Sequence, residues 1–311
     1  IGAASSQLLV GHSKAHQKLE KKLSHFLNRE AALIFPSGYQ ANLAMASSLI
    51  DASTVVLQDK LNHASLIDAA LLSKGKSVRY KHKQVEHLLK LIQKHKESRL
   101  VVMTDGVFSM DGDYAEVEEI AAICKDYGAL LVVDDAHGIG VLGATGAGLL
   151  EKLNISNKQV PVLTGTFGKS FGASGAFVAG SKELIELLIQ KARTYIYTTA
   201  LMPAVAAMLC DAIDIVAQGQ ELRAHLQKLI KHFKDKTSLN NHYQSVSESH
   251  IQPIIIGDTD DTNNLSGQLY NQHIIAPAIR PPTVPSGTSR LRISLTAGHT
   301  TEQIDRLFSV L

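Results

Sequence analysis

Short β-rich runs alternate with helical patterns along most of the chain, and this alternation restricts the possible folds more than any other feature. The expected strands are 31–35, 54–57, 100–104, 129–134, 161–164 and 176–179. The helical patterns around them are 14–28, 64–72, 85–96, 116–127 and 181–194, the last led by Ser181 as its N-cap. Residues 130–133 form an unbroken apolar run, which is typical of a strand covered by helices on both faces. The sequence therefore predicts an α/β fold with a mostly parallel sheet.

The rhythm changes in the last third of the chain. The pattern is helical from about 203 to 236, and then shorter elements follow: strand 253–256, helix 263–272, strands 274–279 and 290–295, and helix 300–311. A chain of 311 residues corresponds to about two domains. We expect a large domain over 1–216 and a small C-terminal α/β domain over 217–311.

Composition excludes several classes of function. Lys plus Arg number 31 against 29 for Asp plus Glu, so the net charge of +2 does not favour nucleic acid or an anionic membrane. Cys124 and Cys210 stand alone, so we predict no disulfide framework and no metal site, and expect a cytoplasmic protein. The longest apolar stretch is interrupted by Pro203 and ends at Asp211, which is too short to span a membrane.

Two glycine motifs imitate nucleotide sites. Residues 138–143 read G-x-G-x-x-G after a strong strand, but further loop residues follow instead of a helix, and the acidic Asp134 precedes the glycines. Residues 165–170 end like a Walker A loop, yet Leu163 stands where its first glycine belongs. We therefore expect neither a dinucleotide nor a triphosphate site. Lys169, among small residues beyond a strand end, remains to be explained.

Four polar features suggest a different cofactor. Asp134 and His137 follow the most apolar strand, and Lys169 follows another strand. A glycine turn at 36–42 precedes a helix and offers backbone N–H groups to a phosphate, and His63 opens another helix. A carboxylate, an amine, a phosphate cradle and a flat imidazole are the groups needed to hold pyridoxal 5′-phosphate (PLP).

The segments 105–113, 134–138 and 166–172 together resemble the α-oxoamine synthase family, and the resemblance runs from about Gly11 to the C-terminus. These are fold-type-I PLP enzymes that condense an amino acid with an acyl thioester and release carbon dioxide. Residues 278–285 and 290–292 most resemble the member that condenses L-alanine with a pimeloyl thioester, carried by CoA or acyl-carrier protein, in biotin biosynthesis. The alternatives are a sister synthase that uses glycine and a short acyl-CoA, and an inactive PLP-binding scaffold.

The resemblance implies roles around the cofactor ring. Lys169 would hold PLP covalently and move protons at the substrate Cα, and Asp134 would pair with the pyridine nitrogen. Asp135 is the structural alternative to Asp134. His137 would bond to the phenolic oxygen of the ring. His63 would stack on the ring face and also contact substrate, and Ser109 would lie beside the ring.

The resemblance also implies groups for the phosphate and the substrates. Gly38, Tyr39 and Thr166 would surround the phosphate end, while Thr198 and Thr199 would reach the phosphate of a neighbouring subunit in a homodimer with shared sites.

Arg292 would clamp the amino-acid carboxylate, with Arg290 as the alternative, and we expect only one of the two to point inward. Thr283 would contact the acyl substrate. Members of the family carry a further N-terminal stretch before the residue that matches Ile1.

Overall fold

The computed structural model describes residues 2–239 and 247–311, and these form two compact units. The first unit comprises Ile1–Gly106 and Ala115–Gly219, and the second comprises Val107–Tyr114 and Gln220–Leu311. The main division thus follows Gly219, where the sequence predicts one after residue 216. The membership of Val107–Tyr114 in the second unit is not part of the sequence prediction.

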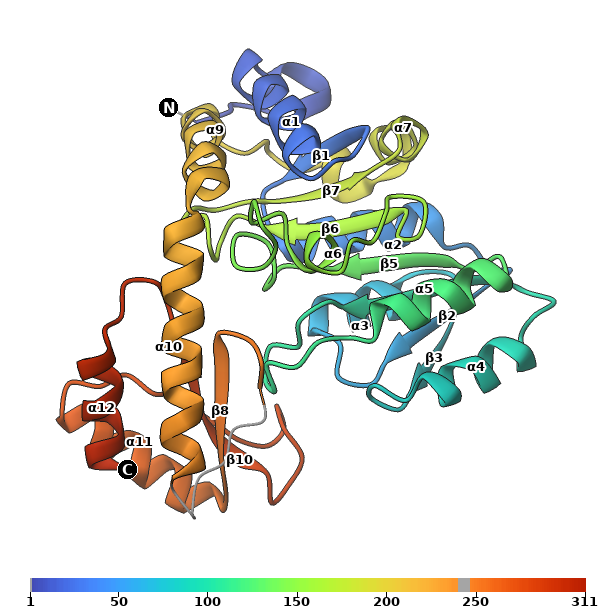
Figure 1. Cartoon of the computed structure of the whole chain (residues 1–311). Coiled ribbons are helices and arrows are strands. Elements are labelled where there is room, and N and C mark those ends of the chain that lie inside the picture. The colour runs from blue at the N-terminus through green and yellow to red at the C-terminus, as the bar shows by residue number, and fades with distance from the viewer. Residues whose placement is uncertain (1, 240–246) are drawn as a thin grey trace. The chain divides into compact units, whose positions relative to one another are not determined.

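A seven-stranded sheet forms the centre of the first unit, in the order β1-β7-β6-β5-β4-β2-β3 (Figure 1). Its strands are β1 Ala31–Phe35, β2 Thr54–Asp59, β3 Lys76–Tyr80, β4 Arg99–Asp105, β5 Leu130–Asp134, β6 Val162–Thr166 and β7 Ala176–Gly180. Only β7 runs against its neighbours, pairing antiparallel with both β1 and β6. This confirms the mostly parallel α/β sheet.

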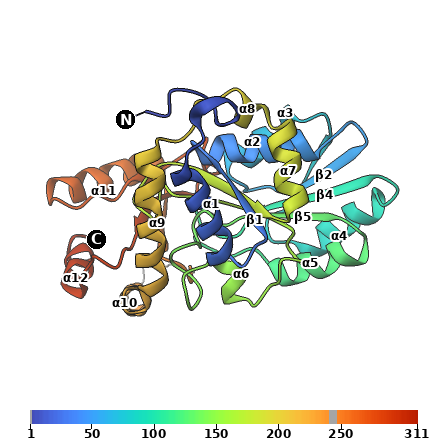
Figure 2. The same cartoon turned by 90° about the horizontal axis from the view of Figure 1, so that it is seen from above.

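Helices cover both faces of this sheet (Figure 2). On one face lie α2 Gly38–Leu49, α3 Ala64–Leu72, α7 Lys182–Lys191 and α8 Arg193–Ile196. On the other lie α4 Val85–Lys94, α5 Val117–Asp126 and α6 Leu149–Lys152. The remaining helices are η1 Gln7–Gly11, α1 Lys14–Phe26 and α9 Pro203–Gln218. As predicted, Ser181 caps α7 by accepting the Leu184 N–H at 3.2 Å.

A core cluster of buried apolar residues lies between the sheet and the α2, α3 and α7 layer. Phe35 of β1, Met103 of β4 and Val178 of β7 are fully buried there against Met45 of α2 and Leu66 of α3. Burial of these side chains fixes which face of each strand meets the helices, because successive side chains alternate across a strand. The rigid layer places α2 and α3 over the sheet.

Five of the six strands that share one direction position the candidate site at their ends. Ser37 follows β1 and His63 follows β2, while Asp105 and Asp134 end β4 and β5, and Lys169 follows β6. Parallel strands bring their carboxyl ends to one edge of a sheet, where α/β proteins bind ligands. Residues that are far apart in the sequence thereby meet at one edge.

The second unit is built on a three-stranded antiparallel sheet in the order β8-β10-β9. Its elements are α10 Gln220–Ser238, β8 Ile251–Gly257, α11 Thr259–Asn271, β9 Ala278–Ile279, β10 Ser289–Ser294 and α12 Thr301–Val310. The strand predicted over 274–279 was too long. Ile275 is exposed and Pro277 has no N–H to donate to a ladder, so only the last two residues pair.

The segment Val107–Tyr114 is bound into this second unit by polar contacts. The Ser247 hydroxyl donates to the Gly112 carbonyl at 3.0 Å, and the Tyr114 hydroxyl donates to the Glu248 carbonyl at 3.1 Å. Gly112 has φ +70°, and a Cβ there would meet the Ile251 carbonyl oxygen at 2.2 Å. Only glycine therefore fits at this turn.

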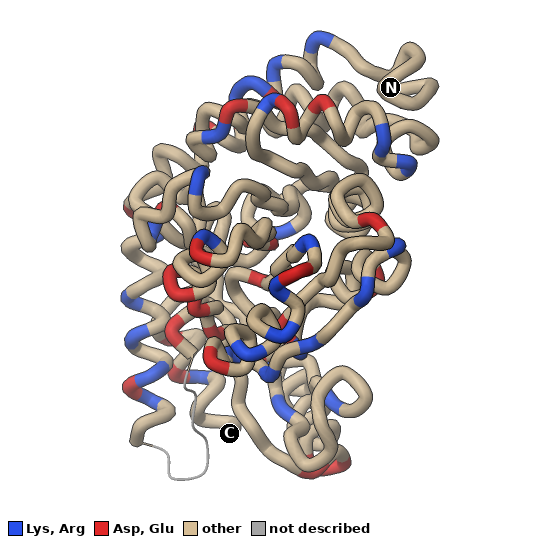
Figure 3. Tube along the Cα trace, turned by 90° about the vertical axis from the view of Figure 1, so that its right-hand side faces the viewer, with Lys and Arg blue, Asp and Glu red and all other residues tan. Residues whose placement is uncertain are grey.

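Basic and acidic residues are interspersed along the chain trace (Figure 3). Both cysteines are buried free thiols. Within residues 2–239 and 247–311, we find no helix that is long and apolar enough to cross a membrane.

Candidate active site

Asp134 ends β5 with its carboxylate held by two neutral donors. Its Oδ2 accepts from the Asn42 side-chain amide at 2.7 Å, and its Oδ1 accepts the Ala136 N–H at 3.0 Å. The side chain is 8% exposed. The carboxylate of Asp134 is thus fixed in orientation by neutral groups.

Asp135, the next residue, is enclosed completely. It is 0% exposed, and its Oδ2 accepts the Leu149 N–H at 2.6 Å. A Cβ on Gly138 or Gly148 would come within 2.0 or 2.1 Å of its carboxylate oxygens, so glycines leave the space it occupies. Burial raises the pKa of Asp135 to about 8, which keeps it protonated at neutral pH. These surroundings support Asp134, rather than Asp135, as the cofactor carboxylate.

The 138–143 glycines are explained by the same loop. Gly140 and Gly143 have φ +86°, and Glu151 accepts the N–H groups of Thr145 and Ala147. No helix opens within the motif, so it is a turn around Asp135 and Glu151. The sequence prediction that it is no dinucleotide fingerprint agrees with this geometry.

Lys169 lies in the exposed loop that follows β6. The Thr166 hydroxyl shapes this loop, accepting the Gly168 N–H at 3.1 Å and donating to the Gly175 carbonyl at 3.0 Å. The Lys169 ammonium acts electrostatically on His63, where it lowers the pKa, and also on Asp105 and Asp135. The lysine therefore lies near the other candidate groups of this unit.

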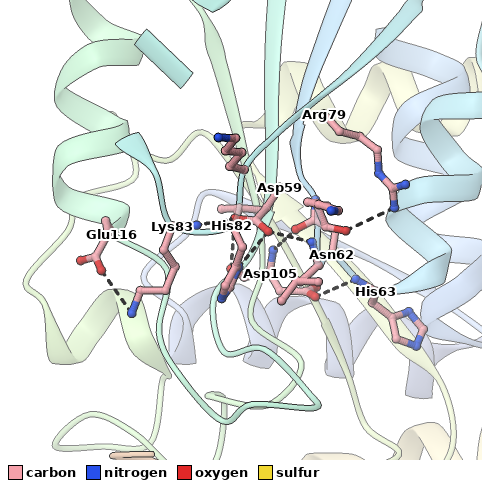
Figure 4. A network of polar contacts seen from close by, with 12 residues as sticks. Asp59, Asn62, His63, Arg79, His82, Lys83, Asp105 and Glu116 are labelled. Carbon is pink, nitrogen blue, oxygen red and sulfur yellow. Dashed lines mark hydrogen bonds and ion pairs between the residues drawn. The ribbon is translucent and has the colours of Figure 1, made fainter. Parts of the chain in front are cut away.

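His63 is the N-cap of α3, and both its backbone and its ring are held. The His63 N–H donates to Asp105 Oδ2 at 2.7 Å (Figure 4), while its Nδ1 faces Ser65. His63 is exposed as a whole residue, yet the protein around it partly desolvates the imidazole. This desolvation lowers the pKa of His63, with the Asp134 and Asp68 carboxylates opposing the shift.

Asp105 is a site residue whose role the sequence reasoning missed. It is buried at the end of β4, its N–H donates to Asn62 Oδ1 at 3.0 Å, and Asn62 donates in turn to the Met103 carbonyl at 2.8 Å. Burial, together with the nearby Asp134 charge, raises the pKa of Asp105 well above its ordinary value. An acid that ends an apolar strand was the available signal.

The same network anchors the segment that leads to His63 (Figure 4). Asp59 accepts from the His82 ring at 2.9 Å and from the Lys83 N–H at 3.1 Å, and the Lys83 amine pairs with Glu116 at 3.2 Å. These contacts tie the loops after β2 and β3 together. His63 thus extends from a fixed backbone.

The residues predicted to bind the cofactor phosphate lie at and beside the start of α2. Ser37 caps the helix by accepting the Gln40 N–H at 3.3 Å, and a Cβ on Gly38 would lie 4.0 Å from the Thr166 Cβ. The first N–H groups of a helix have no partner within it and favour an anion. The Tyr39 hydroxyl donates to Asp68 at 2.6 Å, and this hydrogen bond raises the pKa of the phenol.

The other predicted residues of the first unit lie around this cluster. His137 is half-buried in the turn after Asp135. Thr198 accepts a hydrogen bond from the Gln40 side chain at 3.4 Å, and Thr199 forms a bridge with Ser6. The roles of these residues remain predictions.

In the second unit, the two arginines of β10 have different partners. Arg290 is buried and forms an ion pair with Asp111. Arg292 is partly exposed and donates only to neutral groups, to the Ser109 carbonyl at 2.6 Å and to the Ser294 hydroxyl at 2.8 Å. The expectation that only one would point inward was wrong. Residues two apart share a strand face, and both contact the 107–114 segment.

Ser109 and Thr283 also belong to this second unit. The Ser109 carbonyl holds Arg292, and Thr283 is exposed, with its N–H donating to the Arg280 carbonyl at 3.0 Å. Their predicted contacts with cofactor and acyl substrate remain predictions.

The model of the aminotransferase class I and II family matches residues 1–311. The chain belongs to this family. It is 49% identical to the 8-amino-7-oxononanoate synthase of Thioalkalivibrio sulfidiphilus over 311 residues, which are 100% of this chain and 79% of that protein.

Solved structures show the same likeness. The 8-amino-7-oxononanoate synthase of Francisella tularensis has a TM-score of 0.87 and 32% identity, over 96% of this chain and 86% of that one. A serine palmitoyltransferase from S. paucimobilis with a bound PLP–myriocin aldimine has a TM-score of 0.95 and 30% identity, over 99% of this chain and 78% of that one. The fold of this chain is that of the fold-type-I PLP transferases.

The groups in the first unit fit PLP. The site offers an amine on Lys169, a carboxylate on Asp134 that accepts from the two neutral donors described above, a flat ring on His63 and the start of α2 beside Thr166. This donor set matches the aldehyde, the pyridine nitrogen, the ring face and the phosphate of that cofactor.

Proposed function

We propose that the chain catalyses the decarboxylating condensation of L-alanine with a pimeloyl thioester, giving 8-amino-7-oxononanoate, a free thiol and carbon dioxide. The observation that carries the proposal is that the Lys169 ammonium and the Asp134 carboxylate both act electrostatically on the His63 ring at the carboxyl edge of the sheet. The 49% identity over the whole chain to a protein of this name supports the choice of substrates.

PLP, when bound, supplies an electron sink that stabilises negative charge at the amino-acid Cα. Lys169 would hold the cofactor covalently and carry the proton taken from or returned to Cα. Asp134 would keep the pyridine nitrogen protonated, because a carboxylate favours a cation beside it. The remaining edges of the cofactor would be held by His137, Ser109, Gly38, Tyr39 and Thr166. The phosphate of a neighbouring subunit's cofactor would be reached by Thr198 and Thr199. His63 would cover its ring face.

The substrate groups would come from the second unit. A guanidinium fork matches a carboxylate bidentately, and Arg292 has no carboxylate partner among the described residues, unlike Arg290. We therefore assign Arg292 to the alanine carboxylate. Thr283 would contact the acyl chain.

Exposed apolar side chains support a homodimer with shared sites. Leu9 and Val10 of η1 are 77% and 78% exposed, Leu72 at the end of α3 is 71% exposed, and Tyr197, beside Thr198, is 70% exposed. Apolar side chains exposed on this scale mark interaction surfaces where they are contiguous. The buried free thiols support a location in the cytoplasm.

The test is product analysis of the purified, PLP-loaded protein, with alanine, glycine and serine in competition and pimeloyl, acetyl and palmitoyl thioesters as acyl donors. We expect 8-amino-7-oxononanoate as the main product. A glycine product with a short acyl group would indicate the sister synthase, and no product with any pair would indicate a PLP-binding scaffold. Borohydride reduction followed by peptide mapping should place the cofactor on Lys169, and a label on another lysine would contradict the site.

A further inference from the structure

Asn42 is a polar side chain in an apolar part of helix α2. It is 1% exposed and lies between Ala41 and Leu43, on a helix that packs against the sheet. Its side-chain carbonyl Oδ1 is buried with no hydrogen-bond partner among the described residues, whereas its amide nitrogen makes two hydrogen bonds. The residue is therefore present for its two N–H groups and not for its carbonyl.

Those two N–H groups point to two different parts of the site. One donates to Asp134 Oδ2 at 2.7 Å and the other to Ser65 Oγ at 2.9 Å. An ionised carboxylate can only accept, so Asp134 fixes the amide with its nitrogen inward. Ser65 Oγ then accepts a hydrogen bond from Asn42 through one lone pair, which leaves its own O–H to donate to another acceptor.

Among the described residues, the acceptor that faces the Ser65 hydroxyl is the His63 ring. Ser65 Oγ lies 2.7 Å from His63 Nδ1, and the Ser65 backbone N–H also donates to Nδ1 at 3.2 Å. A ring nitrogen that accepts these bonds carries no proton, so the single proton of a neutral imidazole is on Nε2.

We propose that Asn42 is a positioning residue that acts through Ser65 to hold His63 as a neutral imidazole with its proton on Nε2. The proposal deepens the proposed function, on which it rests for the role of His63 at the cofactor. The charged groups that act on the ring are Asp134, Lys169 and Asp68, and the depressed pKa of His63 agrees with a neutral ring.

The consequence is a link between two cofactor contacts. Asp134, which meets the ring edge, and His63, which covers the ring face, are joined by Asn42 and Ser65 in one chain of hydrogen bonds. A protonated His63 would need its Nδ1 proton to face the Ser65 hydroxyl, which would then have to turn away. The network therefore opposes protonation of the histidine.

The test is long-range ¹H–¹⁵N NMR on the PLP-loaded protein with labelled histidine, with the His63 signals assigned by their loss in His63→Asn. We expect the Nε2–H tautomer in the wild type. In Asn42→Ala and in Ser65→Ala, the His63 pKa should rise by about half a unit to one unit, because one hydrogen bond to the neutral form is lost. Ser65→Thr, which keeps the hydroxyl, should restore the wild-type value.

The double variant Asn42→Ala/Ser65→Ala decides whether Asn42 acts through Ser65. Its His63 pKa should equal that of Ser65→Ala alone, and additive shifts would overturn the proposal. An unchanged pKa in Asn42→Ala, or an Nδ1–H tautomer in the wild type, would overturn it as well.

Ser47→Ala, on the exposed side of the same helix, is the matched control and should leave the His63 pKa and tautomer unchanged. If Asn42→Ala does not fold, Asn42→Leu, which keeps the side-chain volume but removes the two N–H groups, takes its place in the same comparisons. Because the readout is the imidazole and not the product, it remains valid if the substrate assignment fails.

Discussion

The end of β5 in the first unit and strand β10 in the second each carry two like residues, and in each region the two have different surroundings. Asp135 and Arg290 are both buried. Burial raises the pKa of Asp135, which favours its uncharged form, and the charge of Arg290 is compensated by its ion pair with Asp111. Asp134 and Arg292 have neutral partners only in the hydrogen bonds described above.

The difference indicates which charged side chains are neutralised within the fold and which remain available to a ligand. A charged side chain whose charge is already neutralised gives little attraction to a ligand, whereas one held in place by neutral donors or acceptors keeps its full charge and a fixed direction. By this criterion we propose Asp134 and Arg292 as the residues that meet charged ligands. Asp135 and Arg290 support the backbone around them.

The largest expected effect is on turnover in Asp134→Asn. An amide does not hold a pyridine nitrogen protonated, so we expect the rate to fall by at least about a hundredfold, as when a preorganised charge partner is removed. Asp135→Asn should stay within a few-fold of wild type, because the native residue is already uncharged. Steady-state assays of both variants at saturating PLP measure the two rates. The reverse ranking would show that Asp135, and not Asp134, pairs with the cofactor.

Next in size is the loss of alanine affinity in Arg292→Lys. Lysine keeps the charge but not the planar fork, so one charge-assisted hydrogen bond is lost and the midpoint should rise by about one to two decades. Titration of alanine, followed by the cofactor absorbance, gives the midpoint. Arg290→Lys is the matched control and should titrate like wild type. Matching midpoints for all three would remove Arg292 from the substrate site.

A smaller effect is expected on stability in Gly148→Ala. Gly148 has φ +103°, and its new Cβ would lie 2.1 Å from Asp135 Oδ2, so we expect a loss of about 1–3 kcal/mol in the free energy of unfolding. Gly128→Ala, at φ +64° with no atom within 4 Å of the new Cβ, controls for backbone strain alone. Urea unfolding of both compares them. Equal losses would mean that Asp135 does not require the space that Gly148 leaves.

When measured over a single pH unit, the smallest effect is the pH dependence of stability due to Asp135. Its pKa is raised to about 8 from an ordinary 3.8, so between these values the folded state holds a proton that the unfolded state has released. The contribution to stability is complete below pH 3.8 and is lost as pH rises toward 8. Relative to Asp135→Asn, the wild type should therefore lose up to about 1.4 kcal/mol per pH unit across this window. A constant difference would mean that Asp135 is ionised in the folded protein.

Much of the fold could be predicted because its signals are local. Strands β1, β2 and β4 to β7 are apolar runs with both faces covered, and their existence and order along the chain follow from periodicity. β3 was missed because it is an edge strand with polar residues such as Lys76 and Arg79, so no apolar run marks it. The return of Val107–Tyr114 to the second unit depends on partners such as Ser247, 135 positions away from Gly112.

The site divides in the same way. Lys169, Asp134 and His63 stand beyond strand ends in patterns that a family resemblance can interpret. Asn42 has no such pattern, since its role depends on contacts across the fold, such as the one with Asp134, 92 positions away. Asp105 does end an apolar strand, but its role depends on a contact with the His63 N–H, 42 positions away. A buried amide in an apolar helix was the available signal for Asn42.

The Val107–Tyr114 segment affects how this protein can be divided. A gene fragment that encoded only Gln220–Leu311 would omit Asp111, and Arg290 would then be a buried cation without its counter-ion. It would also omit the Gly112 carbonyl that accepts from Ser247. The C-terminal region is therefore not a transferable module. Recombination between relatives would have to exchange the eight-residue segment together with the distant C-terminal part. Chimaeras should therefore be designed with three crossovers, before Val107, after Tyr114 and before Gln220.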